Sequence, residues 1–367
     1  MRPVRQALVL VGPGDERRRV AGMPHLVRLL LSLQRAGIER VVLEGAQAVP
    51  DDPRIACDVV LAADAADAPD APLWERRLVV GPGTVVDEML VRAVLAAARE
   101  EAEVDVEERG ALVRVSAASG DGIGDGEAYG PPAGTLRPLA DSDAAVETAL
   151  LRALENHRDG YLDRLLHRRL SRPLSRVLLR AGVAPDVVTV TGIVAGVAGG
   201  LLVGAAGAAA VGAGVLLLLL SNVLDCADGE IARAGFAESQ RGHLLDVTGD
   251  TLVHLALLAG IALRLTADGQ VPPTWALVLL GLGVLGSFAA ISWSEANEGR
   301  RHQAGGWENR VLDTVLSPLT TRDWYVFPVL FAAAGRLDLL VEAAAVGANV
   351  FWPVVLVLVR RVLARAG

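Results

Sequence analysis

The second half of the chain is dominated by apolar segments that are long enough to cross a lipid bilayer. A spanning helix needs about 20 mostly apolar residues, because the hydrocarbon core is about 30 Å thick and a helix rises about 1.5 Å per residue. The fifth such segment is short and is interrupted by Gly335 and Arg336. The sequence therefore predicts a helical integral membrane domain of six transmembrane helices, at 187–205, 206–224, 244–264, 275–293, 324–335 and 339–359.

Residues 1–140 mix apolar and charged positions and predict a soluble α/β domain. Alternating strands and helices are typical of a largely parallel sheet. Residues 104–116 add a predicted strand pair, and the Gly-, Asp- and Pro-rich stretch 117–135 predicts a linker. The pattern predicts strands at 6–11, 39–43, 58–62 and 77–80, and helices at 25–36 and 86–98.

Residues 141–182 predict amphipathic juxtamembrane helices ahead of the membrane domain, residues 183–367. Leucines alternate there with basic side chains, a composition that suits the headgroup region of a membrane. A solvated, charged helix face is the alternative interpretation. The basic residues are Arg164, His167, Arg168, Arg169, Arg172, Arg176 and Arg180.

The distribution of charge predicts orientation and excludes one class of partner. A formal net charge of -8 argues against nucleic acid. Six spans put both termini on one side, and the loops of the opposite side offer only Arg264 and Arg336. By the positive-inside rule, we expect a multi-pass protein of the cytoplasmic membrane with both termini and the active site on the cytoplasmic side. Arginines that follow the fourth span either serve this rule or bind an acceptor phosphate: Arg300, Arg301, Arg310 and Arg322.

Four aspartates lie within 26 residues, at the boundary between two apolar segments. Asp225 and Asp228 are three residues apart, and Asp246 and Asp250 are four apart, so each pair shares one face of a helix. Two helices that present these pairs toward one point would form an oxygen-rich cage. Such a cage suits Mg²⁺ or Mn²⁺. The two cysteines, Cys57 and Cys226, predict neither a disulfide framework nor a zinc site, and Cys226 is interpreted as a small packing residue.

The spacing D-x2-D-G-x2-A-R-x8-G-x3-D-x3-D resembles the signature of the CDP-alcohol phosphotransferases. The resemblance implies transfer of a phospho-group from a CDP-alcohol, of the CDP-diacylglycerol or CDP-inositol type, to a hydroxyl acceptor such as an inositol phosphate, with release of CMP. It also implies contact with membrane lipid and a homodimer. The fixed positions are Asp225, Asp228, Gly229, Ala232, Arg233, Gly242, Asp246 and Asp250.

The resemblance also assigns roles. It implies that Asp225, Asp228 and Asp246 ligate the metal, and that Asp250 is the general base and a candidate ligand of a second metal. Gly229 lacks a Cβ and would allow close approach of the nucleotide. Arg233 either contacts phosphate or only marks the membrane interface. The implied substrate-binding residues are Gly229, Ala232, Arg233, Gly242 and Thr189.

Residues 7–43 resemble a sugar-nucleotide transferase domain in degenerate form. Gly12–Gly14 and Arg17–Arg19 stand for a shortened nucleotide loop, and the lysine of that family is absent. We therefore expect an inactive cytidylyltransferase-like domain. The domain order is similar to that of the bifunctional inositol-phosphate cytidylyltransferase/di-inositol-phosphate phosphate synthases. A different class, an acid-lined cation transporter or channel without catalysis, would explain the aspartates but not Gly229, Ala232 and Arg233.

Overall fold

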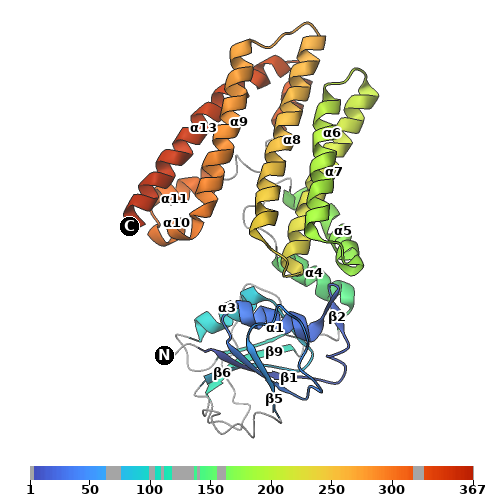
Figure 1. Ribbon diagram of the computed structural model, residues 1–367, viewed down its shortest axis with the longest axis vertical. Coiled ribbons are helices and arrows are strands. Elements are labelled where there is room, and N and C mark those ends of the chain that lie inside the picture. Colours follow the sequence, from blue (N-terminus) through green and yellow to red (C-terminus); the bar gives the residue numbers. More distant parts are fainter. Residues whose placement is uncertain are drawn as a thin grey trace. The chain divides into compact units, whose positions relative to one another are not determined.

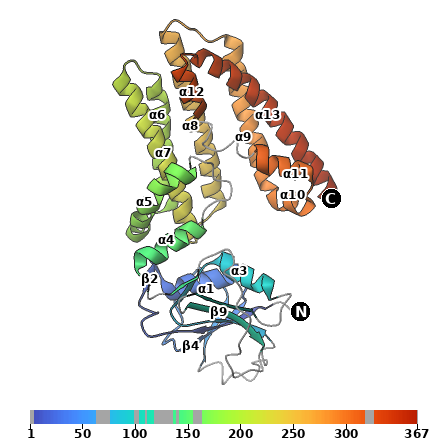
Figure 2. The same ribbon diagram turned by 180° about the vertical axis from the view of Figure 1, so that it is seen from behind.

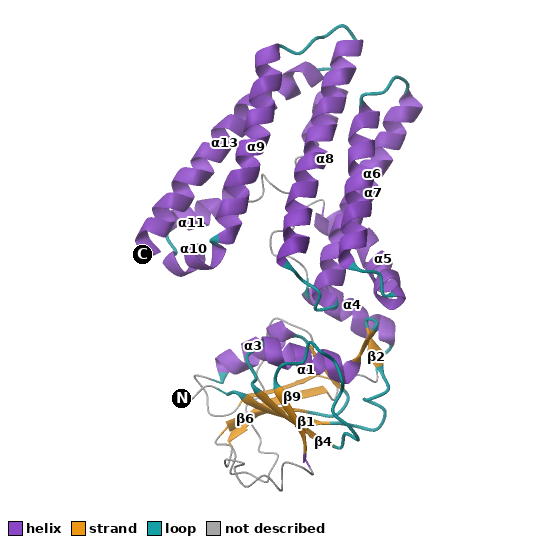
Figure 3. Cartoon of the chain, in the orientation of Figure 1, coloured by secondary structure: helices purple, strands orange, loops and turns teal. Residues whose placement is uncertain are grey.

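A computed structural model of the chain describes residues 4–62, 76–98, 104–108, 111–117, 136–138, 141–154, 163–316 and 326–366. The chain divides into two compact units, one built mainly from Met1–Glu155 and the other mainly from Val183–Arg233 and Ala237–Gly367. The described strands all belong to the first unit, and the described part of the second is helical (Figure 1, Figure 3). The predicted boundaries at residues 140 and 182 stay predictions, and most of the predicted linker 117–135 lies outside the described residues.

A six-stranded sheet with the order β5-β4-β1-β6-β9-β8 forms the centre of the first unit. The first four strands are parallel, whereas β9 is antiparallel to both β6 and β8. The α/β prediction is confirmed, but the sheet is mixed, because the strand pair predicted at 104–116 joins its edge. The strands are β1 (Gln6–Leu10), β4 (Arg40–Glu44), β5 (Asp58–Leu61), β6 (Arg76–Val80), β8 (Val104–Glu108) and β9 (Ala111–Ala117).

Two helices, α1 (His25–Arg35) and α3 (Glu88–Ala97), bury apolar faces in the core of this unit. Leu30 and Leu33 of α1 are fully buried in the same cluster as Leu78 of the sheet. The side chain of Asp87 caps α3 by accepting a hydrogen bond from the Leu90 N–H at 2.8 Å. Four short strands and a third helix complete the described part of the unit: β2 (Arg19–Val20), β3 (Met23–Pro24), β7 (Thr84–Val86), β10 (Leu136–Pro138) and α4 (Asp143–Ala153).

His25 makes the stability of this unit depend on pH. Its side chain is 3% exposed, and Nδ1 has no hydrogen-bond partner among the described residues. Burial lowers the pKa of His25 to about 4; Asp15 opposes this shift, and Arg28 and Arg18 add to it. The unfolded chain takes up a proton near pH 6.5, whereas the folded unit does not. The neutral, buried His25 therefore contributes fully to the free energy of unfolding above pH 6.5. This contribution falls by about 3 kcal/mol as the pH drops toward 4.

We expect the apparent Tm of the full-length protein's first unit to decrease between pH 6.5 and pH 4, and to decrease less in His25→Leu, which does not titrate. Both proteins are heated at each pH in this range, and proteolytic cleavage within residues 4–62 reports unfolding of the first unit. The result is one curve of Tm against pH for each protein. Parallel curves for the two proteins would show that His25 is not responsible.

Five described helices of the second unit are long and apolar enough to cross a membrane. The predicted membrane character is thus confirmed, but the fifth predicted span, 324–335, is not. Its described part, α12 (Val326–Ala333), has eight residues and a length of about 12 Å, because a helix rises about 1.5 Å per residue. The predicted start at residue 324 lies outside the described residues. The five long helices are α6 (Pro185–Val203), α7 (Ala208–Ala234), α8 (Gln240–Ala267), α9 (Thr274–Ala296) and α13 (Leu337–Ala366).

Glycines let the long helices approach one another closely. α6 packs along α8, and α9 packs along α13 (Figure 1). A Cβ on Gly200 would lie 2.6 Å from the backbone nitrogen of Leu257, and one on Gly204 would lie 2.5 Å from the carbonyl oxygen of Gly260. Small residues at helix contacts are the usual means of close packing in membranes. α12 contacts α13 (Figure 2).

Shorter helices precede α6 and lie between α9 and α13. The π-helical turn η1 (Asp163–His167) leads directly into α5 (Arg168–Ala181), within the stretch predicted to be amphipathic. Leu170 and Val177 of α5 are exposed, as expected for a helix at a membrane surface. Three further short elements follow α9: α10 (Glu298–Ala304), α11 (Trp307–Val311) and η2 (Leu312–Leu316).

Candidate functional site

Two helices carry the four aspartates. Asp225 and Asp228 lie in the last ten residues of α7, and Asp246 and Asp250 lie in the first half of α8. The side chain of Ser239 caps α8 by accepting a hydrogen bond from the Gly242 N–H at 2.9 Å. A short turn joins the two helices, so the C-terminal end of α7 and the N-terminal end of α8 lie at the same end of the helix pair (Figure 1).

Three of the aspartates form a cluster. One carboxylate oxygen each from Asp225, Asp228 and Asp246 lies within 4.8 Å of the other two. Asp228 is only 6% exposed, and its Oδ2 has no hydrogen-bond partner among the described residues. Among the described residues, Asp250 is not part of this cluster, but the charges of Asp246 and Asp228 act on it.

The cluster fits a divalent cation. Like charges this close repel one another unless a cation or protons compensate them. The donors are all carboxylate oxygens, the hard ligands that Mg²⁺ and Mn²⁺ prefer. The buried Asp228 Oδ2 supplies a polar atom that protein groups leave unsatisfied. A metal ion would satisfy both requirements.

Thr189 lies beside this cluster from α6. The residue is 7% exposed, and its hydroxyl, 3.1 Å from the Pro185 carbonyl oxygen, also lies within reach of the Asp228 carboxylate. α6 is held here by close packing, because a Cβ on Gly249 of α8 would lie 2.3 Å from Ile193 Cδ1. Thr189 is thus brought to the aspartates, whereas Gly249 serves helix packing.

The other motif residues occupy different surroundings. A Cβ on Gly229 would lie 3.1 Å from Arg233 Nη1, so the missing side chain makes room for the guanidinium. The charge of Arg233 acts on both Asp228 and Asp246. Ala232 is half-buried. Gly242 is set apart, since its surroundings are its own capping residue Ser239 and Asp186.

Sequence reasoning missed a buried ion pair next to the cluster. Glu230, at a variable position of the motif, is fully buried and pairs with Arg168 Nη1 at 3.0 Å. Ser171 and Ser175 donate hydroxyl hydrogen bonds to the same carboxylate at 2.9 and 2.6 Å. Arg168 Nη1 also donates to the Cys226 carbonyl oxygen at 3.2 Å. These contacts bind α5 to the helix that carries Asp225 and Asp228.

The spacing of the three partners was a usable signal for this contact. Arg168, Ser171 and Ser175 are three and four residues apart, so they form a polar stripe on one face of α5. The exposed apolar residues of α5 lie elsewhere on the helix. On an amphipathic helix, a polar stripe of this kind is ordinarily expected to face solvent. Here it is buried, because Glu230 lies opposite it.

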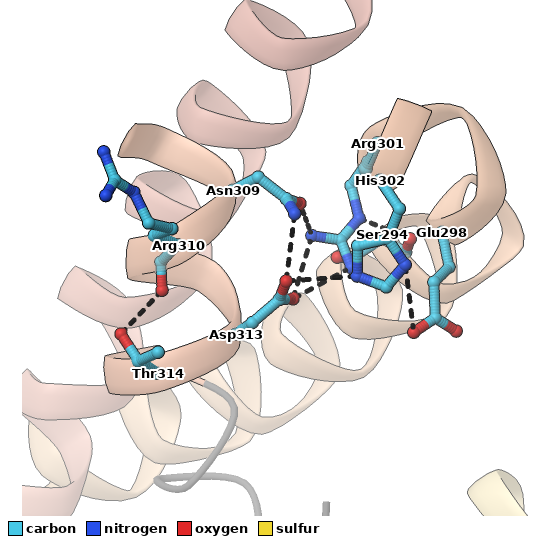
Figure 4. A network of polar contacts seen from close by, with 8 residues as sticks. All are labelled: Ser294, Glu298, Arg301, His302, Asn309, Arg310, Asp313 and Thr314. Carbon is cyan, nitrogen blue, oxygen red and sulfur yellow. Dashed lines mark hydrogen bonds and ion pairs between the residues drawn. The ribbon is translucent and has the colours of Figure 1, made fainter. Parts of the chain in front are cut away.

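A second polar network lies where α9 ends (Figure 4). Arg301 is 2% exposed; its Nε donates to the Ser294 carbonyl oxygen at 3.1 Å and its Nη1 to Asn309 Oδ1 at 2.8 Å. Asp313 adds an ion pair at 3.5 Å. Arg301 is therefore used in joining α10 to α11. Arg310 is exposed, and its side chain points away from this network (Figure 4).

Residues 182–329 match the model of the CDP-alcohol phosphatidyltransferase family, whose members are transferases. The match includes α6, α7, α8 and α9, and with them the aspartate cluster. Comparison with curated proteins gives no match for the chain.

Proposed function

We propose that this protein is a membrane-embedded transferase that moves a phospho-group from a CDP-alcohol to a hydroxyl acceptor and releases CMP. The observation that carries the proposal is the cluster of Asp225, Asp228 and Asp246 within the region that matches the family. A charged cluster in apolar helices is costly and is usually functional. Phosphoryl transfer needs such a cluster, because catalysis depends on positioning and on neutralising phosphate charge.

In this proposal, Asp225, Asp228 and Asp246 hold Mg²⁺ or Mn²⁺ beside the donor. The bound ion would neutralise charge on the pyrophosphate and favour in-line displacement. Arg233 adds a fixed positive charge, and its interaction with Asp228 and Asp246 supports a place next to the same phosphates. Gly229 contributes by leaving space for that guanidinium.

Asp250 is proposed as the general base. Its carboxylate lies outside the three-aspartate cluster, yet the charges of Asp246 and Asp228 act on it, which supports a base placed beside the metal-held donor rather than a further ligand of the same ion. The acceptor hydroxyl loses its proton to Asp250 while its oxygen bonds to the β-phosphorus. The bond from this phosphorus to the oxygen shared with the α-phosphorus breaks, and the electron pair leaves with CMP.

The first unit is proposed to be inactive as a nucleotidyltransferase. The carboxylate of Asp15 is 7% exposed, and its Oδ2 accepts hydrogen bonds from the backbone N–H groups of Gly12 and Gly83, both at 2.8 Å. A nucleotide loop uses such N–H groups to bind phosphate. Here an internal carboxylate occupies them, and its negative charge opposes a phosphate at the same place. This supports the cytidylyltransferase-like but degenerate interpretation.

Orientation and assembly are part of the proposal. The start of α8 lies by the end of α9, and α10, α11 and the C-terminal end of α13 follow there with several arginines. This supports the cytoplasmic side for the active site and for both termini. The homodimer implied by the family resemblance is tested by light scattering of the purified protein in detergent.

The activity is tested by CMP release from the full-length protein in detergent. CDP-diacylglycerol and CDP-inositol are each combined with inositol phosphate or glycerol phosphate, in the presence of Mg²⁺, Mn²⁺ or a chelator. We expect CMP with one donor–acceptor pair, only when divalent metal is present. If no pair yields CMP while the protein in liposomes conducts divalent cations, the transferase proposal is wrong and the aspartates serve transport.

A further inference from the structure

A second group of metal-ligand side chains lies in the membrane unit. Asp163 and His167 stand at the two ends of η1, and Cys226 lies on α7. Asp163 Oδ1 is 2.8 Å from His167 Nδ1 and 3.8 Å from Cys226 Sγ. One ligand atom from each residue lies within 4.8 Å of the other two. The three side chains are 2%, 3% and 3% exposed, so they meet in the protein interior.

The local backbone brings two of them together. η1 is π-helical, and single π-helical turns occur often at functional sites. Side chains four residues apart lie on the same face of a helix, which places Asp163 next to His167. α5 follows without a break, and the Arg168–Glu230 ion pair fixes its start against α7, where Cys226 is located. The π-helical turn thus brings Asp163 next to His167, and the Arg168–Glu230 ion pair holds both against the helix that carries Cys226.

The donor set differs in chemistry from the aspartate cluster. A thiolate, an imidazole and a carboxylate form a borderline-soft set that favours zinc-type ions, whereas three carboxylates favour Mg²⁺ or Mn²⁺. We propose that Asp163, His167 and Cys226 form a binding site for one zinc-type transition-metal ion, separate from the ion at Asp225, Asp228 and Asp246.

The distances are close to those a tetrahedral site requires. Bonds of about 2.0 Å to nitrogen and oxygen and about 2.3 Å to sulfur separate neighbouring ligand atoms by about 3.3–3.6 Å. The Asp163–His167 pair, at 2.8 Å, must widen by about 0.5 Å, and the Asp163–Cys226 pair, at 3.8 Å, must close by a few tenths of an ångström. Small side-chain rotations supply both changes. The three protein ligands leave a fourth position for water or a substrate group.

Charge supports the ion as well. A divalent cation with one carboxylate, one thiolate and one neutral imidazole has no net charge, so its burial carries little of the cost of an unpaired ion. Binding releases the proton of the Cys226 thiol to solvent. The site would fasten η1 to α7 immediately beside Asp225. It would also lower the negative charge near Asp250, on which Asp163 acts.

The test uses Co²⁺ as a spectroscopic substitute for Zn²⁺ in the full-length, chelator-treated protein in detergent. A bond between Co²⁺ and a thiolate gives an intense near-ultraviolet charge-transfer absorption that carboxylate ligands do not give. We expect this absorption to saturate at one Co²⁺ per chain and to disappear when Zn²⁺, but not Mg²⁺, is added. Absence of the absorption in the wild-type protein overturns the proposal, whatever the variants do.

Cysteine variants assign the ligand. Cys57 and Cys226 are the two cysteines of the chain, so Cys57→Ser is a matched control for Cys226→Ser. We expect the absorption to persist in Cys57→Ser and to be lost in Cys226→Ser, with Co²⁺ affinity more than tenfold weaker in His167→Gln. Asp246→Asn should keep it, since that residue belongs to the other cluster. Loss in Cys57→Ser, or persistence in Cys226→Ser, would contradict the assignment.

Discussion

Asp250→Asn is expected to lower the rate of CMP release by roughly 10²–10⁴-fold, the usual contribution of a positioned general base, and to leave donor binding in place. The amide has the shape of the carboxylate but cannot take the acceptor proton. Because Asp250 lies outside the cluster of Asp225, Asp228 and Asp246, the variant should still bind the metal and the CDP-linked donor. Steady-state CMP release and equilibrium binding of the donor measure the two effects separately.

Asp246→Asn is the matched comparison, because the same change is made four residues earlier on the same helix. This residue is part of the three-aspartate cluster, so we expect loss of both donor binding and metal dependence. Near-normal turnover in Asp250→Asn would show that another group takes the proton. Unchanged metal dependence in Asp246→Asn would show that the cluster does not hold the catalytic metal.

Arg168→Met is expected to destabilise the membrane unit by about 3–5 kcal/mol, the usual result of removing one partner from a buried ion pair. Arg168 and Glu230 are 4% and 0% exposed at the side chain, so the substitution leaves a carboxylate charge in the interior. For a unit of this size, that loss corresponds to an apparent Tm lower by roughly 6–20 °C. Thermal unfolding of the purified protein in detergent measures it.

The control is the double variant Arg168→Met/Glu230→Gln. Glutamine removes the unpaired charge and keeps oxygen and nitrogen atoms near Ser171 and Ser175, which contact Glu230 in the native protein. We expect most of the lost stability to return, because the cost comes from an isolated buried charge rather than from a missing contact. If the double variant is as unstable as the sum of the two single changes, the residues do not act as a pair.

Fold prediction succeeded where the signal was local. Alternating short apolar runs predicted β1, β4, β5 and β6, and the strand pair at 104–116 was located before its place in the sheet was known. Five long apolar helices were predicted near their observed positions. The fifth predicted span, 324–335, is not confirmed: the described helix there, α12, has eight residues and ends at Ala333, just before the turn at Gly335.

The candidate site divides in the same way. The spacing of Asp225 with Asp228, and of Asp246 with Asp250, is enough to predict shared helix faces, because the period of a helix is fixed. The spacing did not predict that Asp250 would lie outside the cluster. It also did not reveal that Gly229 makes room for Arg233, since that depends on where a long side chain turns.

By itself, the sequence determined that the second half is a membrane domain and that each aspartate pair shares one face of a helix. Both follow from composition and helical period, which are properties of one segment at a time. Only the tertiary structure decided which residues contact the positions between those aspartates. Glu230 pairs with Arg168, 62 residues earlier, and Cys226 lies against Asp163, 63 residues earlier. Such contacts depend on the rotation and depth at which one helix packs on another, which close packing at glycines and a buried ion pair determine here.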